Sequence, residues 1–532
     1  MKRREFLTTG LAAVSGMAFV GTAARCAGAT NLHNLLRAAT RHKDTTIGIG
    51  VRSPSGLPGQ SKMSLVGAVN AAPSVFVSSR LGSTGRPWLG FGFNQYPLCR
   101  DGLGHDTRWT EDTWRLTTGR MAVIQPALVR INLYRGWFNP QVEGSQSRVG
   151  PYAWNDWRMQ EFYKVVRWYR ERKIPVMSGL WDYNYGVKDF YTSKGEDSFQ
   201  SLQVDLLEHL FKVEHLTNIR WYTPTNEPKG GGVSFEQWST MIRNTHEGFS
   251  KAGLPKDILV GPDSWDDWTA QSAERDQDYL RGYDHHYYLN NGQSELTDGS
   301  LEAILRTSQV DAVYGKDPDV TKPVFLGEMG AVASDHADYW FTDPHTSPIA
   351  PDFEYGLGML DYGIQAARAG EASALAWALD GFDNNKSPGM WDISGQHGGL
   401  ALRPWYYTWS LLCRYFPAGA AIHKMGQPSN MRIVAAEVAA GKGAHWSLAL
   451  VNRDPSQAHT VRLQVPGWGA GKFDAYTYCS ASQGDGTALV LPSVVIKTAS
   501  GGLESGLDVT VPAGGGMVLT TMNRMPLTVV RH

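Results

Sequence analysis

The sequence predicts an α/β fold, a (β/α)8 TIM barrel, followed by a C-terminal antiparallel β-sandwich. Eight short apolar runs alternate with longer amphipathic stretches between residues 86 and 417, which is the pattern of repeated strand-helix units. After residue 418 short strand-like runs continue without helical patterns between them, which is typical of a sandwich. With 532 residues, the chain is long enough for one large domain and a smaller partner.

The eight predicted barrel strands are mostly apolar, as strands buried on both faces of a parallel sheet are. Helical patterns lie between most of them, such as WNDWRMQEFYKVVRWYRERK before the third and FEYGLGMLDYGIQAARAG before the eighth. An open doubly wound sheet is the alternative, but no G-x-G-x-x-G turn follows an early strand, so the closed barrel is favoured. The strands are predicted at residues 88–94, 128–134, 174–183, 219–227, 257–263, 282–288, 323–330 and 374–381.

The segments outside the barrel complete the predicted domain plan. Strand-like runs within residues 63–80 have no helix beside them, so we expect them to join the sandwich. The two ends of the chain would then meet in one accessory domain. The predicted domains are a signal peptide at 1–29, an N-terminal segment at 30–85, the barrel at 86–417 and the sandwich at 418–532.

The first 29 residues have the features of a twin-arginine export signal. Arg3 and Arg4 precede a mildly apolar run from Leu11 to Ala24, and Ala27-Gly28-Ala29 fits an A-x-A cleavage site. An uncleaved membrane anchor is the alternative, but this run is short and contains Gly, Ser and Thr. We therefore expect a periplasmic or extracellular protein that leaves the membrane after cleavage.

Composition excludes several classes of partner. The 50 basic and 51 acidic residues nearly cancel, which leaves no basic surface for nucleic acid. Once Cys26 leaves with the signal, Cys99, Cys413 and Cys479 remain. Three such widely spaced thiols form neither a disulfide framework nor a zinc site, and at most one bridge is possible. The 19 tryptophans and 22 tyrosines offer flat apolar faces that pack in a core or stack on sugar rings.

Acidic side chains follow the fourth and seventh predicted strands. The run IRWYTPTNE ends in Asn226 and Glu227, and Pro228 stops the strand by removing a backbone donor. Glu328 lies in PVFLGEMG at the end of the seventh strand. Because the carboxyl ends of barrel strands meet at one mouth, we expect the two carboxyl groups to face one cleft.

Two facing carboxyl groups suit the cleavage of a glycosidic bond. One must be protonated to assist the leaving oxygen, and the other must be ionised to attack the anomeric carbon. A neighbouring carboxylate favours the protonated form of Glu227, whereas the guanidinium of Arg130, on the second strand, favours the ionised form of Glu328. On the sixth strand His286 and Tyr288 share one face, where His286 is predicted to bond substrate or Glu227, and Tyr288 to bond Glu328.

Further polar and aromatic residues are candidates for contacts with a sugar. Asn226 is predicted to bond the sugar 2-hydroxyl, and Trp377 in ALAWALDG to form a floor beneath the reacting ring. Five other tryptophans follow strand ends and either line subsites or pack in the core, namely Trp137, Trp181, Trp265, Trp268 and Trp391. Asp380, Asp383 and Asp392 form a cation or hydroxyl site or, as we favour, a solvated loop.

The ordered set of these residues resembles the glycoside hydrolases of clan A, most closely family 5, with families 30 and 39 as neighbours. The resemblance spans about residues 86–417 and rests on Arg130, Asn226-Glu227-Pro228, His286-x-Tyr288, Glu328 in Gly-Glu-Met-Gly, and Trp377. It implies a TIM barrel in which Glu227 is the acid/base and Glu328 the nucleophile, with retention of configuration through a glycosyl-enzyme intermediate.

The resemblance is not uniform across these families. TPTNEP and FLGEMG are similar to family 5, whereas a sandwich built from both chain ends is similar to families 30 and 39. The histidine that family 5 often has after its third strand is absent from WDYNYG, where Asp182 or Asn184 takes its place. Trp181 and Asp182 are therefore included among the predicted substrate-binding residues.

The function predicted from these features is an exported retaining hydrolase of a β-linked plant or microbial glycan, acting on an oligo- or polysaccharide. The alternatives are a carbohydrate-binding barrel without turnover, and a transglycosylase. The sequence has no P-loop and no G-x-S-x-G elbow, and His246-Glu247 lacks the second histidine of a zinc protease helix. We therefore expect hydrolysis without a metal or nucleotide cofactor.

Overall fold

The computed structural model describes one compact unit within Gly67–His532. The predicted signal peptide and the remainder of the chain before residue 74 lie outside the described residues. No helix in the described part combines the length and the apolar character that a bilayer span needs. The described residues are 74–81, 86–101, 105–140, 149–181, 188–289, 294–330, 352–380, 389–393, 400–441, 443–465, 471–497, 503 and 506–523.

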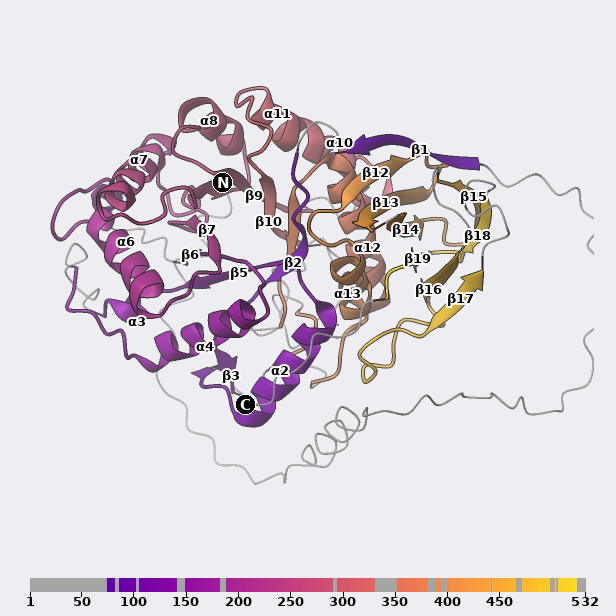
Figure 1. Ribbon diagram of the computed structural model, residues 1–532, viewed down its shortest axis with the longest axis horizontal. Coiled ribbons are helices and arrows are strands. Elements are labelled where there is room, and N and C mark those ends of the chain that lie inside the picture. The colour runs from indigo at the N-terminus through magenta and orange to yellow at the C-terminus, as the bar shows by residue number, and fades with distance from the viewer. Residues whose placement is uncertain are drawn as a thin grey trace, which may run out of the picture. The chain divides into compact units, whose positions relative to one another are not determined.

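Eight parallel strands form the barrel, in the sheet order β7-β6-β5-β2-β11-β10-β9-β8 (Figure 1). A parallel bridge between Tyr222 and Leu259 joins the two ends of this order and closes the sheet. Six of the eight strands are buried along their whole length, as the apolar runs predict. The strands are β2 Gly90–Asn94, β5 Leu128–Leu133, β6 Val176–Leu180, β7 Ile219–Thr223, β8 Val260–Ser264, β9 Gly282–Tyr288, β10 Val324–Gly330 and β11 Ser373–Ala376.

Helices surround the barrel, and their ends follow from local sequence. Ser234 and Gln237 form a capping box at the start of α7, and Asp156 accepts a backbone hydrogen bond at the start of α4. The helices are α2 Glu111–Ile124, α3 Arg135–Phe138, α4 Trp157–Glu171, α5 Lys188–Tyr191, α6 Phe199–Glu208, α7 Phe235–Lys251, α8 Trp268–Arg275, α9 Ser294–Thr297, α10 Leu301–Leu305, α11 Asp311–Tyr314, α12 Asp352–Ala369 and α13 Pro404–Tyr415, with π-helical turns η2 His209–Val213 and η3 Arg306–Val310.

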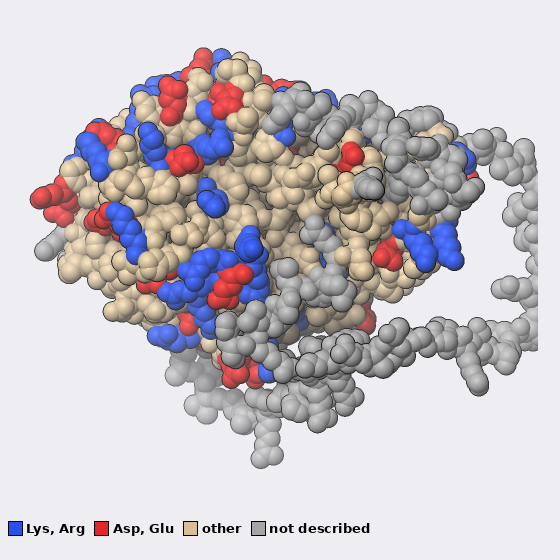
Figure 2. Space-filling view, viewed as in Figure 1, with Lys and Arg blue, Asp and Glu red and all other residues tan. Residues whose placement is uncertain are grey.

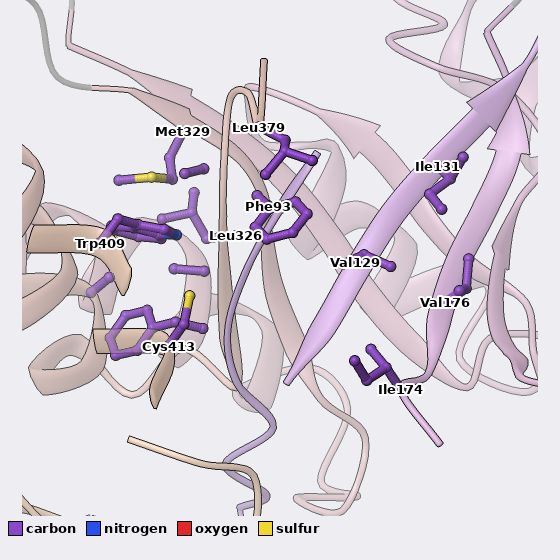
Figure 3. Close-up of a cluster of buried hydrophobic side chains, with 14 of the residues drawn as sticks. Phe93, Val129, Ile131, Ile174, Val176, Leu326, Met329, Leu379, Trp409 and Cys413 are labelled. Carbon is purple, nitrogen blue, oxygen red and sulfur yellow. The ribbon is translucent and has the colours of Figure 1, made fainter. Parts of the chain in front are cut away.

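Outward-facing side chains of the barrel strands pack against side chains of the surrounding helices. Phe93, Val129 and Leu326 come from three barrel strands, and Trp409 and Cys413 reach in from α13 (Figure 3). The indole of Trp409 also donates to the Gly92 carbonyl at 2.8 Å. Helix α13 is therefore fixed against β2. Inside the barrel, below the mouth, a separate cluster fills the space, made of Leu128, Met177, Val260, Phe325 and Leu375.

The second sheet is an antiparallel sandwich that takes strands from both ends of the described chain. Strand β1 (Ser74–Leu81) pairs antiparallel with β12 and parallel with β15, and Figure 1 shows it beside strands from the C-terminal region. The sheet order is β17-β16-β19-β14-β13-β12-β1-β15-β18. The later strands are β12 Ala421–Met425, β13 Met431–Ala440, β14 Gly443–Asn452, β15 His459–Gln464, β16 Lys472–Tyr478, β17 Ser493–Lys497, β18 Leu507–Val511 and β19 Gly515–Thr520.

The sandwich has its own core and is bound to the barrel through α12. Residues such as Ile433, Leu448 and Val509 bury the inner faces of its strands against one another. Arg368 at the end of α12 donates to the carbonyls of Met425 and Ile433 at 2.9 and 2.7 Å. Sandwich and barrel are therefore connected by buried hydrogen bonds as well as by the chain.

Acidic and basic side chains alternate over the face of the barrel seen in Figure 2, with no continuous stripe of either charge on that face. A small hairpin of β3 (Cys99–Arg100) and β4 (Asp106–Thr107) follows β2. Cys99, Cys413 and Cys479 are free thiols, so the single bridge that the sequence allowed is not formed.

Candidate active site

The polar residues expected at the barrel mouth come from three strands and the turn after a fourth. Arg130 lies on β5, His286 and Tyr288 on β9, and Glu328 on β10. Glu227 lies beyond the strand end, since β7 stops at Thr223 and the chain turns before Pro228. Its φ of 41° is unusual for a residue with a side chain, and such backbone strain is typical of functional positions.

The carboxyl groups of Glu227 and Glu328 converge. One oxygen of each, together with a ring nitrogen of His286, lies in a group whose atoms are all within 4.8 Å of one another. The Glu227 side chain is 28% exposed and the Glu328 side chain 6%. The first carboxyl group can therefore exchange protons with solvent, and the second is held inside the protein.

Arg130 is the centre of the hydrogen-bond network beneath these carboxyl groups. Its side chain is only 1% exposed. Nη1 donates to Glu328 Oε1 at 2.6 Å and to Asn94 Oδ1 at 2.8 Å. Nη2 donates to Asn226 Oδ1 at 2.6 Å and to both Asp263 oxygens at 3.0 Å. One guanidinium thus ties together residues from β2, β8, β10 and the turn after β7.

His286 and Tyr288 complete the contacts of the two glutamates. The His286 ring lies 3.0 Å from Glu227 Oε1 through Nδ1 and 2.7 Å from Asp263 Oδ1 through Nε2. The Tyr288 hydroxyl donates to Glu328 Oε2 at 2.9 Å. Each glutamate therefore has its own partner on β9, and His286 Nδ1 also lies 3.5 Å from Glu328.

The charges in this cluster change one another's pKa. Burial lowers the pKa of His286, but the negative charges of Glu328 and Asp263 raise it well above its usual value, which favours the imidazolium form of the ring. Burial raises the pKa of Asp263, yet Arg130 and His286 lower it to about 2. Burial raises the pKa of Glu328 above its ordinary value, although His286 and Arg130 counter part of that rise.

This balance differs from the sequence expectation for Glu328. Arg130 does contact Glu328, but it shares its charge with Asp263, and burial opposes its effect. His286, Arg130 and the Tyr288 hydroxyl favour the ionised form of Glu328 together, but burial outweighs them and its pKa stays above the ordinary value.

A fourth carboxyl group lies deeper in the barrel. Asp284 on β9 is fully buried, and burial and the neighbouring Asp263 raise its pKa well above the ordinary value. Its protonated form is therefore favoured. A Cβ added at Gly327 would lie 2.0 Å from Asp284 Oδ1, so the glycine that precedes Glu328 makes room for this carboxyl group.

Two tryptophans form one wall of the mouth. The rings of Trp181 and Trp377 stack with centroids 5.2 Å apart and planes 6° from parallel, and Arg130 lies 5.8 Å from the Trp181 centroid. Asp182 and Asn184, the expected substitutes for a histidine after the third strand, lie outside the described residues. The roles of these residues toward a sugar stay predictions.

Most of the other tryptophans considered from sequence pack in the protein. Trp137, Trp268 and Trp391 are buried, whereas Trp265 is partly exposed and lies against Gly230 beside the Glu227 turn. His285, which neighbours His286, is buried on the opposite strand face and contacts Glu371 at 3.0 Å.

The expectation of a solvated loop around three aspartates is wrong for the two that are described. Asp380 and Asp392 are only 1% and 4% exposed, so neither side chain lies in solvent. Burial raises the pKa of Asp380 to about 7. Asp383 lies outside the described residues.

Two groups have a spacing that would suit a metal ion, Glu227-His286-Glu328 and Asp263-Asp284-His286. Both include His286, whose imidazolium has no free lone pair for a metal. The Arg130 guanidinium beside them also opposes a further cation. In this charge state the residues present fit a hydrogen-bonded cluster better than a metal centre.

Asn94, Asp263 and Asp284 belong to the site but were not singled out from the sequence. Asn94 accepts from Arg130 and donates to the carbonyls of Gly327 and Leu375. Asp263 ends the apolar run DILVGPD, so the rule that found Glu227 and Glu328, a polar residue at the end of a barrel strand, also applies to it. Asp284 gives no such signal, since it lies inside its strand.

No protein-family model matches this sequence, and no curated protein matches it. Solved structures match the fold at low sequence identity. An endoxylanase of glycoside hydrolase family 30 from Clostridium papyrosolvens superposes with a TM-score of 0.56 and 12% identity, over 84% of this chain and 99% of that one. The alignment covers the barrel and the sandwich together, so the chain shares its overall fold with this structure.

Two further structures give the same result. A family 51 alpha-L-arabinofuranosidase from Bifidobacterium longum has a TM-score of 0.54 and 14% identity, over 85% of this chain and all of that one. A glucosidase from Croceicoccus marinus has a TM-score of 0.55 and 11% identity, over 85% and 99% of the two chains. The fold is thus that of barrel-containing glycoside hydrolases, and family 30 is one of the neighbours that the sequence motifs indicated.

Proposed function

We propose that this protein is a retaining glycoside hydrolase, in which Glu227 is the acid/base and Glu328 the nucleophile. The observation that carries the proposal is the convergence of two carboxyl groups to within 4.8 Å at the mouth of a barrel. Retaining enzymes hold their two carboxyl groups about 5 to 5.5 Å apart, whereas inverting enzymes need about 6.5 to 9.5 Å to admit a water. The short separation favours direct attack by a carboxylate.

The two glutamates suit different halves of the reaction. In the first step a Glu328 oxygen bonds the anomeric carbon, the glycosidic carbon-oxygen bond breaks, and Glu227 gives its proton to the leaving oxygen. In the second step Glu227 takes a proton from water, the water oxygen bonds the anomeric carbon, and the ester to Glu328 breaks. The greater exposure of Glu227 suits proton exchange, and the hydrogen bonds from Arg130 and Tyr288 suit a fixed nucleophile.

The surrounding residues position these groups. The Asn226 oxygen accepts from Arg130, so its amide nitrogen is free to turn toward a sugar 2-hydroxyl next to Glu227. Trp377 provides an apolar floor, on which a sugar ring can stack. His286 donates to Glu227 and Asp263 and so fixes the orientation of the acid/base.

The substrate that we propose is a β-linked plant or microbial glycan, and transfer to a sugar hydroxyl would compete with hydrolysis. We also propose export by the twin-arginine pathway, on the strength of Arg3, Arg4 and the A-x-A site. A fusion of residues 1–29 to a reporter that is active only outside the cytoplasm tests this part. Loss of export in an Arg3→Lys, Arg4→Lys variant supports it, and unchanged export contradicts it.

The assignment of roles is tested with two classes of aryl β-glycoside. Leaving groups of low pKa, such as 2,4-dinitrophenol, need little protonation, so Glu227→Gln should retain most of its kcat/KM on them, whereas kcat should fall because the second step still needs a base. On unactivated glycosides the same variant should lose about 10²- to 10⁴-fold in rate. Glu328→Gln should lose activity on both classes, because no other group forms the intermediate.

Glu371→Gln is the matched control, since this buried glutamate precedes β11 at the opposite end of the barrel. It should leave the ratio between the two substrate classes unchanged. A protein that only binds carbohydrate would release no aglycone at all, and equal losses for Glu227→Gln on both classes would contradict the assigned acid/base.

A further inference from the structure

Asn132 has an unpaired amide at the mouth of the barrel. It follows Arg130 by two residues on β5, so both side chains lie on the same face of the strand. The residue is only 7% exposed, yet neither its Nδ2 nor its Oδ1 has a hydrogen-bond partner in the described part of the protein. Buried amides are almost always paired, so an unpaired one calls for a ligand that supplies the missing contacts.

The Asn132 side chain lines a small cavity beside the two carboxyl groups. The cavity also contacts Asn94, Arg130, Trp181 and Trp377, and its volume is about 20 Å³. That volume holds about one water molecule and is too small for a sugar ring. The stacked rings of Trp181 and Trp377 form its aromatic wall. A sugar ring can therefore fit beside the amide only if this wall moves.

We propose that Asn132 binds two neighbouring hydroxyls of an uncharged sugar, and that the cavity opens when Trp181 moves off Trp377. This inference rests on the proposed function and names the class of sugar that the site accepts. An amide offers one donor and one acceptor side by side. Two adjacent hydroxyls match this pair, because one can donate to Oδ1 while the other accepts from Nδ2.

The charges around the cavity favour an uncharged sugar over a uronic acid. Arg130 is the one cation among the cavity-lining residues described, and its two terminal nitrogens already donate to Glu328, Asn94, Asn226 and Asp263. A sugar carboxylate would lack a cationic partner there. It would also face the carboxylate of Glu328, which costs free energy in a site with little solvent.

Trp181 is the wall that can move. Its ring is partly exposed and its contacts are ring contacts, with Trp377, with Tyr134 and with the Arg130 guanidinium. A sugar ring that stacks on Trp377 takes the place of Trp181. The Trp377 ring then exchanges one apolar contact for another of similar kind. The movement would change the surroundings of two indoles, which makes tryptophan fluorescence a reporter of binding.

Asn132→Leu tests the role of the amide, because leucine has a similar volume and no polar atoms. The variant should be at least as thermostable as the wild type, since an unpaired buried amide is removed. Its kcat/KM on the best uncharged aryl glycoside should fall by about tenfold or more. A purely structural role predicts the opposite, a lower Tm with unchanged kcat/KM.

Asn218→Leu is the matched control. Its amide is also buried but donates to the carbonyls of Val166 and Ile174 at 3.2 and 3.3 Å, away from the barrel mouth. This variant should lower Tm and leave kcat/KM unchanged at temperatures where it stays folded. If both variants behave alike, Asn132 has no special role toward the sugar.

A binding titration separates this inference from the proposed function. Tryptophan fluorescence of the wild type and Asn132→Leu is followed with glucose, galactose, mannose, xylose, arabinose and glucuronic acid. We expect saturable change with at least one uncharged sugar, weakened about tenfold or more in the variant, and none with glucuronic acid. If Asn132→Leu hydrolyses aryl glycosides as well as the wild type does, the inference is wrong but the proposed function is unaffected. Preference for the glucuronide, or no response to any of these sugars, would also overturn it.

Discussion

Replacing Asp263 by asparagine should weaken the fold in a way that depends on pH. Asp263 is fully buried and accepts hydrogen bonds from Arg130 and His286. Its pKa falls from an ordinary 3.8 to about 2 in the folded protein, a difference that corresponds to about 2 kcal/mol of stability at neutral pH. The substitution also removes negative charge beside the buried cations Arg130 and His286. The total loss in the free energy of unfolding should therefore be about 2 to 4 kcal/mol.

The sign of the pH effect follows from the direction of this shift. A carboxyl group whose pKa is lowered by folding stabilises the protein above its unfolded pKa, and the contribution disappears as pH falls through the folded pKa. The difference in the free energy of unfolding between wild type and Asp263→Asn should therefore be largest at about pH 6, and it should shrink between about pH 4 and pH 2. Urea unfolding followed by tryptophan fluorescence measures both free energies.

Asp361→Asn is the matched control for this experiment. Asp361 is also buried and paired with an arginine, Arg453, at 2.6 Å, but it lies on α12, which faces the sandwich rather than the mouth. Both variants should lose stability, whereas only Asp263→Asn should impair turnover, because Asp263 orients Arg130 and His286. Equal stability of wild type and Asp263→Asn at about pH 6, or a gap that widens in acid, would refute the reasoning.

Two further predictions concern the groups around Glu328. Tyr288→Phe removes a hydrogen bond to the Glu328 carboxylate, so the already raised pKa of Glu328 should rise further. The acid limb of the plot of kcat/KM against pH should then move to higher pH. An acid limb that does not move would count against the contact. Gly327→Ala introduces a Cβ 2.0 Å from Asp284 Oδ1 and should cost about 1 to 3 kcal/mol in urea unfolding. Gly119→Ala in α2, where a Cβ meets nothing within 4 Å, should instead gain up to about 1 kcal/mol, and similar values for both glycines would show that the close approach is unimportant.

The barrel and the sandwich were predictable from the sequence because buried parallel strands read as apolar runs and antiparallel strands as short runs without helices. The predicted strand at 282–288 matches β9, and the other seven differ from the structure by a few residues at their ends. Strand β12 does not stand out in the sequence, because AIHKM is short and contains His and Lys. Its two polar side chains are paired only in the folded protein, His423 with Glu437 at 2.9 Å and Lys424 with Glu302 at 2.7 Å.

The candidate site was predictable only in part. Glu227, Glu328 and Arg130 stand out because strong charges at strand ends are uncommon in a buried barrel. Asn94 and Asp263 also end predicted strands, but single Asn and Asp residues are ordinary at such turns, so their position alone does not mark them as site residues. Their importance follows from the hydrogen bonds that Arg130 makes across the barrel to β2 and β8. The sequence alone does not show that these residues lie close to Arg130 in space.

The stereochemistry of the first product tests the central claim most directly. Proton NMR of an aryl β-glycoside digest, recorded before the free sugar equilibrates, distinguishes the two anomers. If Glu227 and Glu328 act within 4.8 Å of each other as acid/base and nucleophile, the first product should be the β-anomer. A first product of inverted configuration would contradict the account, because it would require a water between the two carboxyl groups.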